Sequence, residues 1–174
     1  MVLNMLGAEK AAHYYIAFAI ASLIFMIPNS VATSLFVEGS YGESLKSNTV
    51  KSLIAITGLL IPTVLFVYFF GDIILILFGK GYLESLELLR VFVLSSFFVS
   101  IVYIYLAIKR VQMDVGGIII LNALTCSLLL LSSYLLMPVF GIVGVGYAWL
   151  LSYGFATLVV VGLIVVKEKW IWIF

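Results

Sequence analysis

The chain alternates between long apolar segments and short polar connections. A helix needs roughly 20 apolar residues to cross a hydrocarbon core of about 30 Å. Five segments meet this length, at about 13–36, 51–78, 90–108, 116–137 and 142–166. Lipid offers no hydrogen-bond partner to open backbone groups, so such segments fold as helices. The pattern therefore predicts an all-α polytopic membrane bundle of about five transmembrane helices, forming one domain over residues 1–174.

The polar connections are short and contain turn residues. They read "VEGSYGESLKSNTVK", "GKGYLESLELLR", "KRVQMD" and "MPVFG", and the last is short enough to predict a tight antiparallel hairpin. In the second connection Gly79 and Gly81 can end one helix and turn the chain. Glu87 then suits the positive end of the next helix dipole, and we expect it to pair with Arg90 three residues later. These features predict a surface turn and no chemistry.

Composition excludes most other classes. The chain is 65% hydrophobic and 10% charged, whereas soluble domains are about a quarter charged. A lone histidine, His13, and a lone cysteine, Cys126, cannot supply a catalytic triad, a disulfide framework or a metal pattern. No nucleotide-binding loop, zinc-protease motif or paired intramembrane carboxylates are present. We therefore expect no enzyme activity, no cofactor and no nucleic-acid partner. The N-terminal sequence "MVLNMLGAEK" lacks the positively charged first region that is typical of a signal peptide.

Lysine and arginine positions predict the orientation. With five spans, the connections alternate between the two sides of the membrane. One side carries Lys46, Lys51, Lys109, Arg110, Lys167 and Lys169, and the other carries Lys10, Lys80 and Arg90. Positive residues concentrate on the cytoplasmic side. We expect a multi-pass protein of the cell (cytoplasmic) membrane, with its N-terminus outside and its C-terminus in the cytoplasm.

The first span carries a polar face. On a helix, Tyr15, Ala19, Ser22, Met26, Asn29 and Thr33 fall within a sector of about 80°. This face can line a water-filled cavity, or its groups can hydrogen-bond to a neighbouring helix. Pro28 removes a backbone donor, and we expect a kink near Ile24. His13 precedes the face, and we interpret it as an interfacial residue rather than a ligand or a proton relay.

Three further polar residues lie in or near the other spans. Tyr103 either anchors its helix at the interface together with the nearby cations or faces a cavity and stacks on a sugar ring. Asn122 shares a helix face with Cys126 and needs a hydrogen-bond partner if it is buried. That partner is either another helix or a substrate. Asp72 is an acid in a span and is a functional candidate for that reason, although it lies close to the turn after the second span.

The last span has a ladder of small residues, Gly144, Ala148, Ser152 and Ala156, each four positions after the one before. Small residues at this spacing let another helix approach closely. We interpret the ladder as a helix-packing device without chemistry.

Three stretches resemble landmarks of one family. "LGAEKAAHYYIAFAIASLIFMIPNSVATSLF" resembles the second helix of a lobe in the polysaccharide-type flippases, with its Gly–acid start, Tyr-led helix and "IP". "IILILFGKGYLESLELLRVFVLSSFF" is similar to the next landmark, and "MPVFGIVGVGYAWLLSY" to the entry of a late helix. These flippases share a superfamily with multidrug-and-toxin exporters and the lipid II flippase. The landmarks occur in family order and cover nearly the whole chain.

The resemblance implies a partial transporter. It implies that the chain corresponds to helices two to six of the C-terminal lobe, with a lipid-linked oligosaccharide as cargo. It also implies a second membrane polypeptide or lobe, because such transporters rock one lobe against the other around a central cavity. The substrate-path candidates are Tyr15, Asn29, Thr33, Tyr103 and Asn122.

Two other functions stay open at this point. One is a fragment of a multidrug or organic-cation exporter, for which Asp72 is the sole acidic candidate. The other is a structural or assembly membrane protein that transports nothing, in which the Gly144–Ala156 ladder is an oligomer interface.

Overall fold

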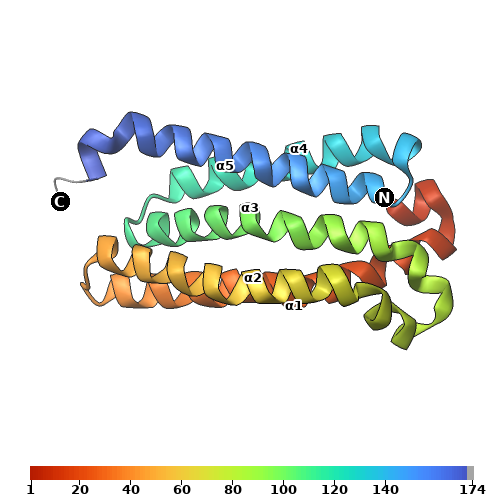
Figure 1. Cartoon of the computed structure of the whole chain (residues 1–174). Helices are drawn as coiled ribbons and strands as arrows, with labels where there is room; N and C mark the ends of the chain where they lie inside the picture. Colours follow the sequence, from red (N-terminus) through yellow and green to blue (C-terminus); the bar gives the residue numbers. More distant parts are fainter. Residues whose placement is uncertain (172–174) are drawn as a thin grey trace.

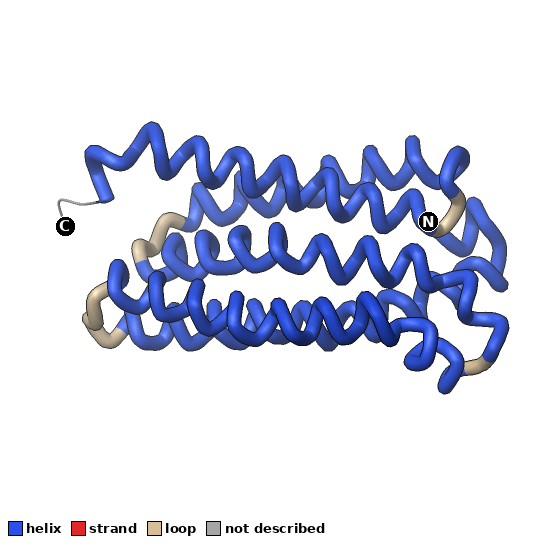
Figure 2. Tube along the Cα trace, viewed as in Figure 1, coloured by secondary structure: helices blue, strands red, loops and turns tan. Residues whose placement is uncertain are grey.

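The chain folds into a bundle of long helices joined by short turns (Figures 1 and 2). The computed structural model describes residues 1–171, and the side chains of residues 1–165. The helices are α1 (Val2–Ser40), α2 (Leu45–Phe78), α3 (Leu86–Val111), α4 (Val115–Phe140) and α5 (Val143–Ile171), with a 3₁₀ helix, η1 (Lys80–Ser85), between α2 and α3. All five α-helices are long and apolar enough to cross a membrane. The predicted all-α membrane fold is therefore confirmed.

The helices extend beyond the predicted spans. α2 has 34 residues, which is about 51 Å of helix and more than a hydrocarbon core requires. It begins at Leu45 rather than near residue 51, because Ser44 caps it by accepting a hydrogen bond from the backbone of Ser47 at 3.4 Å. Hydropathy marks the part of a helix that lies in lipid, whereas capping decides where the helix ends.

The bundle has two distinct ends. The N-terminus, η1 and the α4–α5 turn lie at one end, and the α1–α2 and α3–α4 turns lie at the other, with the C-terminus (Figure 1). Lys46, Lys51, Lys109 and Arg110 therefore gather at the end that the charge count assigns to the cytoplasm. The side chains of Lys167 and Lys169 lie outside the described residues.

The non-helical break inside the first helix lies at Gly7, outside the segment where a kink near Ile24 is expected. Dihedral angles remain helical through Pro28 and Ile24, and the non-helical residue inside α1 is Gly7, with φ of +86°. The φ that proline imposes suits a helix, whereas glycine, without a Cβ, adopts positive φ at little cost. The first turn of α1 consequently leaves the axis of the rest of the helix (Figure 1).

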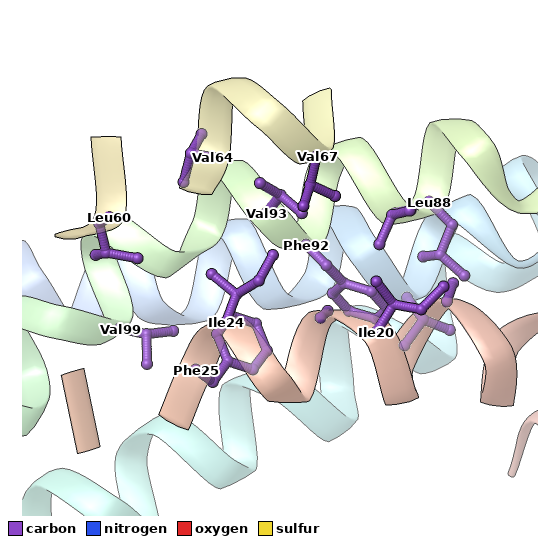
Figure 3. Close-up of a cluster of buried hydrophobic side chains, with 14 of the residues drawn as sticks. Ile20, Ile24, Phe25, Leu60, Val64, Val67, Leu88, Phe92, Val93 and Val99 are labelled. Carbon is purple, nitrogen blue, oxygen red and sulfur yellow. The ribbon is translucent and has the colours of Figure 1, made fainter. Parts of the chain in front are cut away.

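Helix α3 is the centre of the bundle. It contacts α1, α2 and α5, and 67% of its apolar stretch is buried, against 11% for the peripheral α4. Leu88, Phe92, Val93 and Val99 project from it into the core, where they meet side chains of α1 and α2 (Figure 3). Helix association inside lipid depends on close van der Waals packing rather than on the exclusion of water. A well-filled central helix is therefore what holds this bundle together.

The core of α3 also contains hydroxyl groups. Ser95, Ser96 and Ser100 are buried, and each donates to the carbonyl three residues earlier at 2.6 Å. A buried hydroxyl without a partner is costly, and these local bonds satisfy all three. They leave no free polar group between the helices at these positions.

The turn after α2 is held by contacts between helices. Glu87 accepts a hydrogen bond from the Tyr147 hydroxyl at 3.0 Å. Arg90 donates from Nε to the Tyr68 carbonyl at 3.2 Å, and its guanidinium lies 5.0 Å from the centre of the Tyr68 ring. The expected pairing of Glu87 with Arg90 is therefore wrong, because partners on α5 and α2 engage the two side chains. The turn is a junction where three helices meet.

Candidate functional site

Helices α3, α4 and α5 enclose a cavity of about 280 Å³. Its lining consists of Val102, Tyr103, Leu106, Asn122, Thr125, Cys126, Leu129 and Tyr153. Two of the predicted substrate-path residues, Tyr103 and Asn122, meet here although they come from different helices. We call this space the tyrosine cavity. Its lining is mostly apolar and offers two phenols, an amide and a hydroxyl.

The polar groups of the tyrosine cavity differ in whether they already form hydrogen bonds within the chain. Thr125 donates to the carbonyl of Leu121 at 2.8 Å, so its hydrogen is used within α4. The Asn122 side chain is exposed and makes no hydrogen bond to any residue that the structure describes. An interhelical bond for Asn122 is therefore absent from the described part of the chain. Its amide is free to bind a ligand.

Both tyrosines near this end of α3 have a cationic neighbour, Lys109 beside the Tyr105 ring and Arg110 near Tyr103. The Lys109 ammonium lies 5.6 Å from the centre of the Tyr105 ring. Tyr103 is half-buried and lines the tyrosine cavity. Tyr103 therefore lines the cavity and also lies near a cation, so its position is compatible with both interpretations.

A stack of aromatic rings connects the tyrosine cavity to α1. Phe25 and Trp149 are stacked with ring centres 5.2 Å apart and 3° between planes, and Trp149 stacks on Tyr153 at 5.1 Å. Tyr153 then lines the cavity. We did not predict this cluster from the sequence. Its signals were the four-residue spacing of Trp149 and Tyr153 and the seven-residue spacing of Phe18 and Phe25, which place each pair on one helix face.

The polar face of α1 borders this stack. Tyr15, Asn29 and Thr33 are all exposed, and the Thr33 hydroxyl donates to the Asn29 carbonyl at 2.8 Å. Asn29 lies one helical turn beyond Phe25, so it is next to the aromatic stack. Its side-chain amide makes no hydrogen bond to a described residue. Asn29 is eleven residues from the end of α1, or about 16 Å along the helix, and lies inside the apolar part of the first span.

His13 lies at the opposite end of α1 from the α1–α2 turn and is buried, with 7% of its surface exposed. Its ring packs edge-on against Tyr82 at 5.3 Å, and its backbone carbonyl accepts from the Ser85 hydroxyl at 3.1 Å. Nδ1 has no hydrogen-bond partner and lies 3.7 Å from a Glu84 oxygen. Lys10 also binds Glu84. The residue is therefore a buried link between α1 and η1 rather than a surface residue.

Asp72 is half-buried on α2 and does not line the tyrosine cavity. Nothing in its position connects it to the polar face of α1 or to the aromatic stack. The structure does not bring this acid together with the other candidates.

The small-residue ladder lies within the chain. Ala148, Ser152 and Ala156 are buried, and the Ser152 hydroxyl lies 3.4 Å from the Ser132 hydroxyl of α4. A Cβ added to Gly144 would fall 2.6 Å from the backbone of α4. The ladder thus lets α4 and α5 approach each other closely.

The fold defines an integral, multi-pass helical membrane protein. No group of three or more histidine, cysteine or acidic residues in the described part of the chain lies close enough to hold a metal ion. Comparison with protein-family models, curated proteins and solved structures found no match to the chain.

Proposed function

We propose that the chain is a membrane component of a flippase that moves lipid-linked oligosaccharide or polysaccharide precursors across the cytoplasmic membrane. It acts together with a second membrane polypeptide or lobe. The observation that carries the proposal is the polar face of α1, where the Asn29 amide is exposed inside the first span and has no hydrogen-bond partner among the described residues.

An exposed amide at that depth cannot remain in contact with lipid tails. Moving an amide into an apolar medium without a hydrogen bond costs roughly 2–7 kcal/mol. Asn29 must therefore face water, a substrate or another protein. The family resemblance of residues 6–36 implies that this helix lines a cavity between two lobes. If the polar face of α1 lies against a second lobe, the Asn29 amide has a polar environment and the helix lines a cavity between two lobes.

The lining of the tyrosine cavity suits an uncharged, hydroxyl-rich cargo. Tyr103 and Tyr153 offer aromatic rings on which apolar ring faces can pack. Asn122 offers both donors and acceptors for hydroxyl groups. An organic cation would instead call for an acid in the lining, and none of the lining residues is acidic. This comparison favours sugar over a cationic drug.

The proposed orientation places the N-terminus outside and the C-terminus in the cytoplasm. The described lysines and arginines are more numerous at the end of the α1–α2 and α3–α4 turns, and such residues concentrate on the cytoplasmic side. The tyrosine cavity then lies nearer the cytoplasmic side, where a lipid-linked precursor would enter.

Deletion of the chain tests the proposal. Lipid-linked oligosaccharide should then accumulate in the cytoplasmic leaflet and return to its normal level when the chain is restored. A normal leaflet distribution after deletion, in cells that depend on this precursor, would overturn the proposal.

A matched pair of variants tests the polar face. The Asn29→Leu, Thr33→Leu double variant should assemble normally but fail to restore transport. Thr57→Leu makes the same kind of exchange at an exposed threonine on α2 and should restore it fully. Full transport by the double variant would exclude the polar face as part of the path.

The requirement for a second half has its own test. A second membrane polypeptide should co-purify with the chain in mild detergent, and transport in vesicles should need both. Transport by the isolated chain alone would contradict this part of the proposal.

A further inference from the structure

A second hollow lies between α1 and α2, at the end of the bundle that holds the α1–α2 turn. It has a volume of about 510 Å³ and is lined by Ser30, Val31, Ser34, Glu38, Glu43, Lys51, Ser52 and Ala55. We call it the serine–glutamate groove. It shares no lining residue with the tyrosine cavity, and the proposed function does not use it.

Both carboxylates of the groove are held in place. Glu38 accepts a hydrogen bond from the Ser34 hydroxyl at 2.9 Å, one turn earlier on α1. Glu43 accepts from the side-chain amide of Asn48 at 2.7 Å, and Asn48 is almost fully buried. In each case the bond engages one carboxylate oxygen and leaves the second available for a ligand.

The other side of the groove is basic. The Lys51 ammonium is 3.4 Å from the Asn48 side-chain oxygen, a single contact that leaves further N–H donors. Asn48 therefore bridges Glu43 and Lys51, and it fixes an acid and a base near each other in the lining.

Ser52 is the strongest sign that the groove binds a ligand. It is 8% exposed, lines the groove and makes no hydrogen bond to any described residue. The buried serines of α3, by contrast, donate to carbonyls of their own helix at 2.6 Å. The Ser52 oxygen is not among the fully buried atoms that lack a partner, so the hydroxyl remains accessible and is available to a ligand.

The groove extends from the depth of a lipid headgroup into the apolar part of the spans. Ser30 and Ala55 are each about ten residues from the α1–α2 turn, so the groove runs about 15 Å along the helices. Its open end begins at Glu43, outside the apolar part of α2. Val31 and Ala55 line its deep end and offer an apolar surface for acyl chains.

We propose that the serine–glutamate groove binds a phospholipid whose headgroup carries an ammonium group and a phosphate, as phosphatidylethanolamine does. The ammonium group binds Glu38 and Glu43, since three N–H donors match two fixed carboxylates. The phosphate binds Lys51 and the Ser52 hydroxyl. A metal ion is a poorer occupant, because the Lys51 cation lines the same space and would repel it. An anionic lipid would meet two carboxylates and one lysine and is disfavoured.

The experiment measures lipid binding to the full chain purified in mild detergent. Native mass spectrometry would compare phosphatidylethanolamine, its N-trimethylated analogue phosphatidylcholine, and phosphatidylglycerol, all with the same acyl chains. We expect phosphatidylethanolamine to bind about tenfold more tightly than either, because only it donates N–H bonds to carboxylates. Equal binding of the three lipids would overturn the proposal. Free phosphoethanolamine should compete weakly, and competition as strong as that of the lipid would assign the groove to a soluble ligand instead.

Variants locate the binding. The Glu38→Gln, Glu43→Gln double variant should lose at least about tenfold in affinity for phosphatidylethanolamine, and Ser52→Ala a smaller factor. Glu9→Gln, an exposed acid at the other end of the bundle, should bind as the parent chain does. The melting temperature without added lipid should be the same for Ser52→Ala and the parent chain, which separates lost binding from lost folding. Unchanged affinity in both groove variants would exclude the site.

Discussion

Gly144 of α5 rests against the backbone of Leu136 on α4, so closely that a Cβ at position 144 would fall 2.6 Å from the Leu136 carbonyl oxygen. Backbone atoms cannot move aside as the end of a flexible side chain can. The absence of a side chain at this position therefore sets how closely α4 and α5 approach, directly after the turn that joins them.

Replacing Gly144 with alanine should separate the two helices. We expect Gly144→Ala to lower the free energy of unfolding by about 1–3 kcal/mol, which is the usual cost of overpacking. Gly154→Ala is the matched control on the same helix, since a Cβ there would meet no atom within 4 Å. Thermal unfolding in mild detergent, followed by tryptophan fluorescence, compares the two. An equal melting temperature for both variants would contradict the close contact.

His13 should behave as a packing residue. Its Nδ1 is buried without a hydrogen-bond partner, so the His13→Phe variant loses no hydrogen bond and keeps an aromatic ring beside Tyr82. We expect a change in unfolding free energy of less than about 1 kcal/mol. His13→Ala leaves a void next to Tyr82 and should lower the melting temperature clearly.

The same His13→Phe variant separates packing from proton transfer. In a reconstituted transport assay it should retain the parental rate. A variant that folds with an unchanged melting temperature but has lost transport would favour a proton relay at His13 and would contradict the packing role.

Asp114 should stabilise the start of α4 in two ways. One carboxylate oxygen accepts from the Gly117 backbone at 2.9 Å and caps the helix, and the other accepts from the Lys109 ammonium at 2.7 Å. Asp114→Ala removes both contacts and should cost about 1 kcal/mol, as loss of an N-cap usually does. Asp114→Asn keeps the cap and should cost less. Chemical denaturation of the two variants gives the order, and equal costs for both would show that the ion pair outweighs the cap.

The sequence was sufficient to predict the number of helices and where the chain turns. The length of an apolar segment decides whether it can cross the membrane, and each of the five long apolar segments corresponds to one helix in the structure. Which face of each helix is buried could not be predicted, because apolar residues face both lipid and protein in a membrane. Helices α3 and α4 are both strongly apolar, yet one is central and the other lies at the edge of the bundle. Only packing distinguishes them.

The candidate site was predicted in part, for the same reason. Tyr103 and Asn122 could be predicted as candidates because few polar side chains occur in the apolar spans, and the sequence alone shows which ones they are. That they line one cavity depends on how α3, α4 and α5 pack, and so does the stack of Trp149 on Phe25. The buried Nδ1 of His13 could not be foreseen either, because its burial depends on η1 folding back over α1.

The polar face of α1 should be accessible to water, and thiol labelling can show this directly. Asn29→Cys, made in a Cys126→Ser background, places a single thiol inside the first membrane span. Maleimides react with the thiolate, which forms in water and hardly at all in lipid. Leu23 is the control position, since it is 66% exposed on α1 and lies about 120° around the helix from Asn29. We expect a small hydrophilic maleimide to label the Asn29→Cys variant in intact membranes at least about tenfold faster than the Leu23→Cys variant. Slow labelling at both positions would mean that lipid or a packed helix covers Asn29. The face would then be a contact surface between helices, and the transport path would have to lie elsewhere.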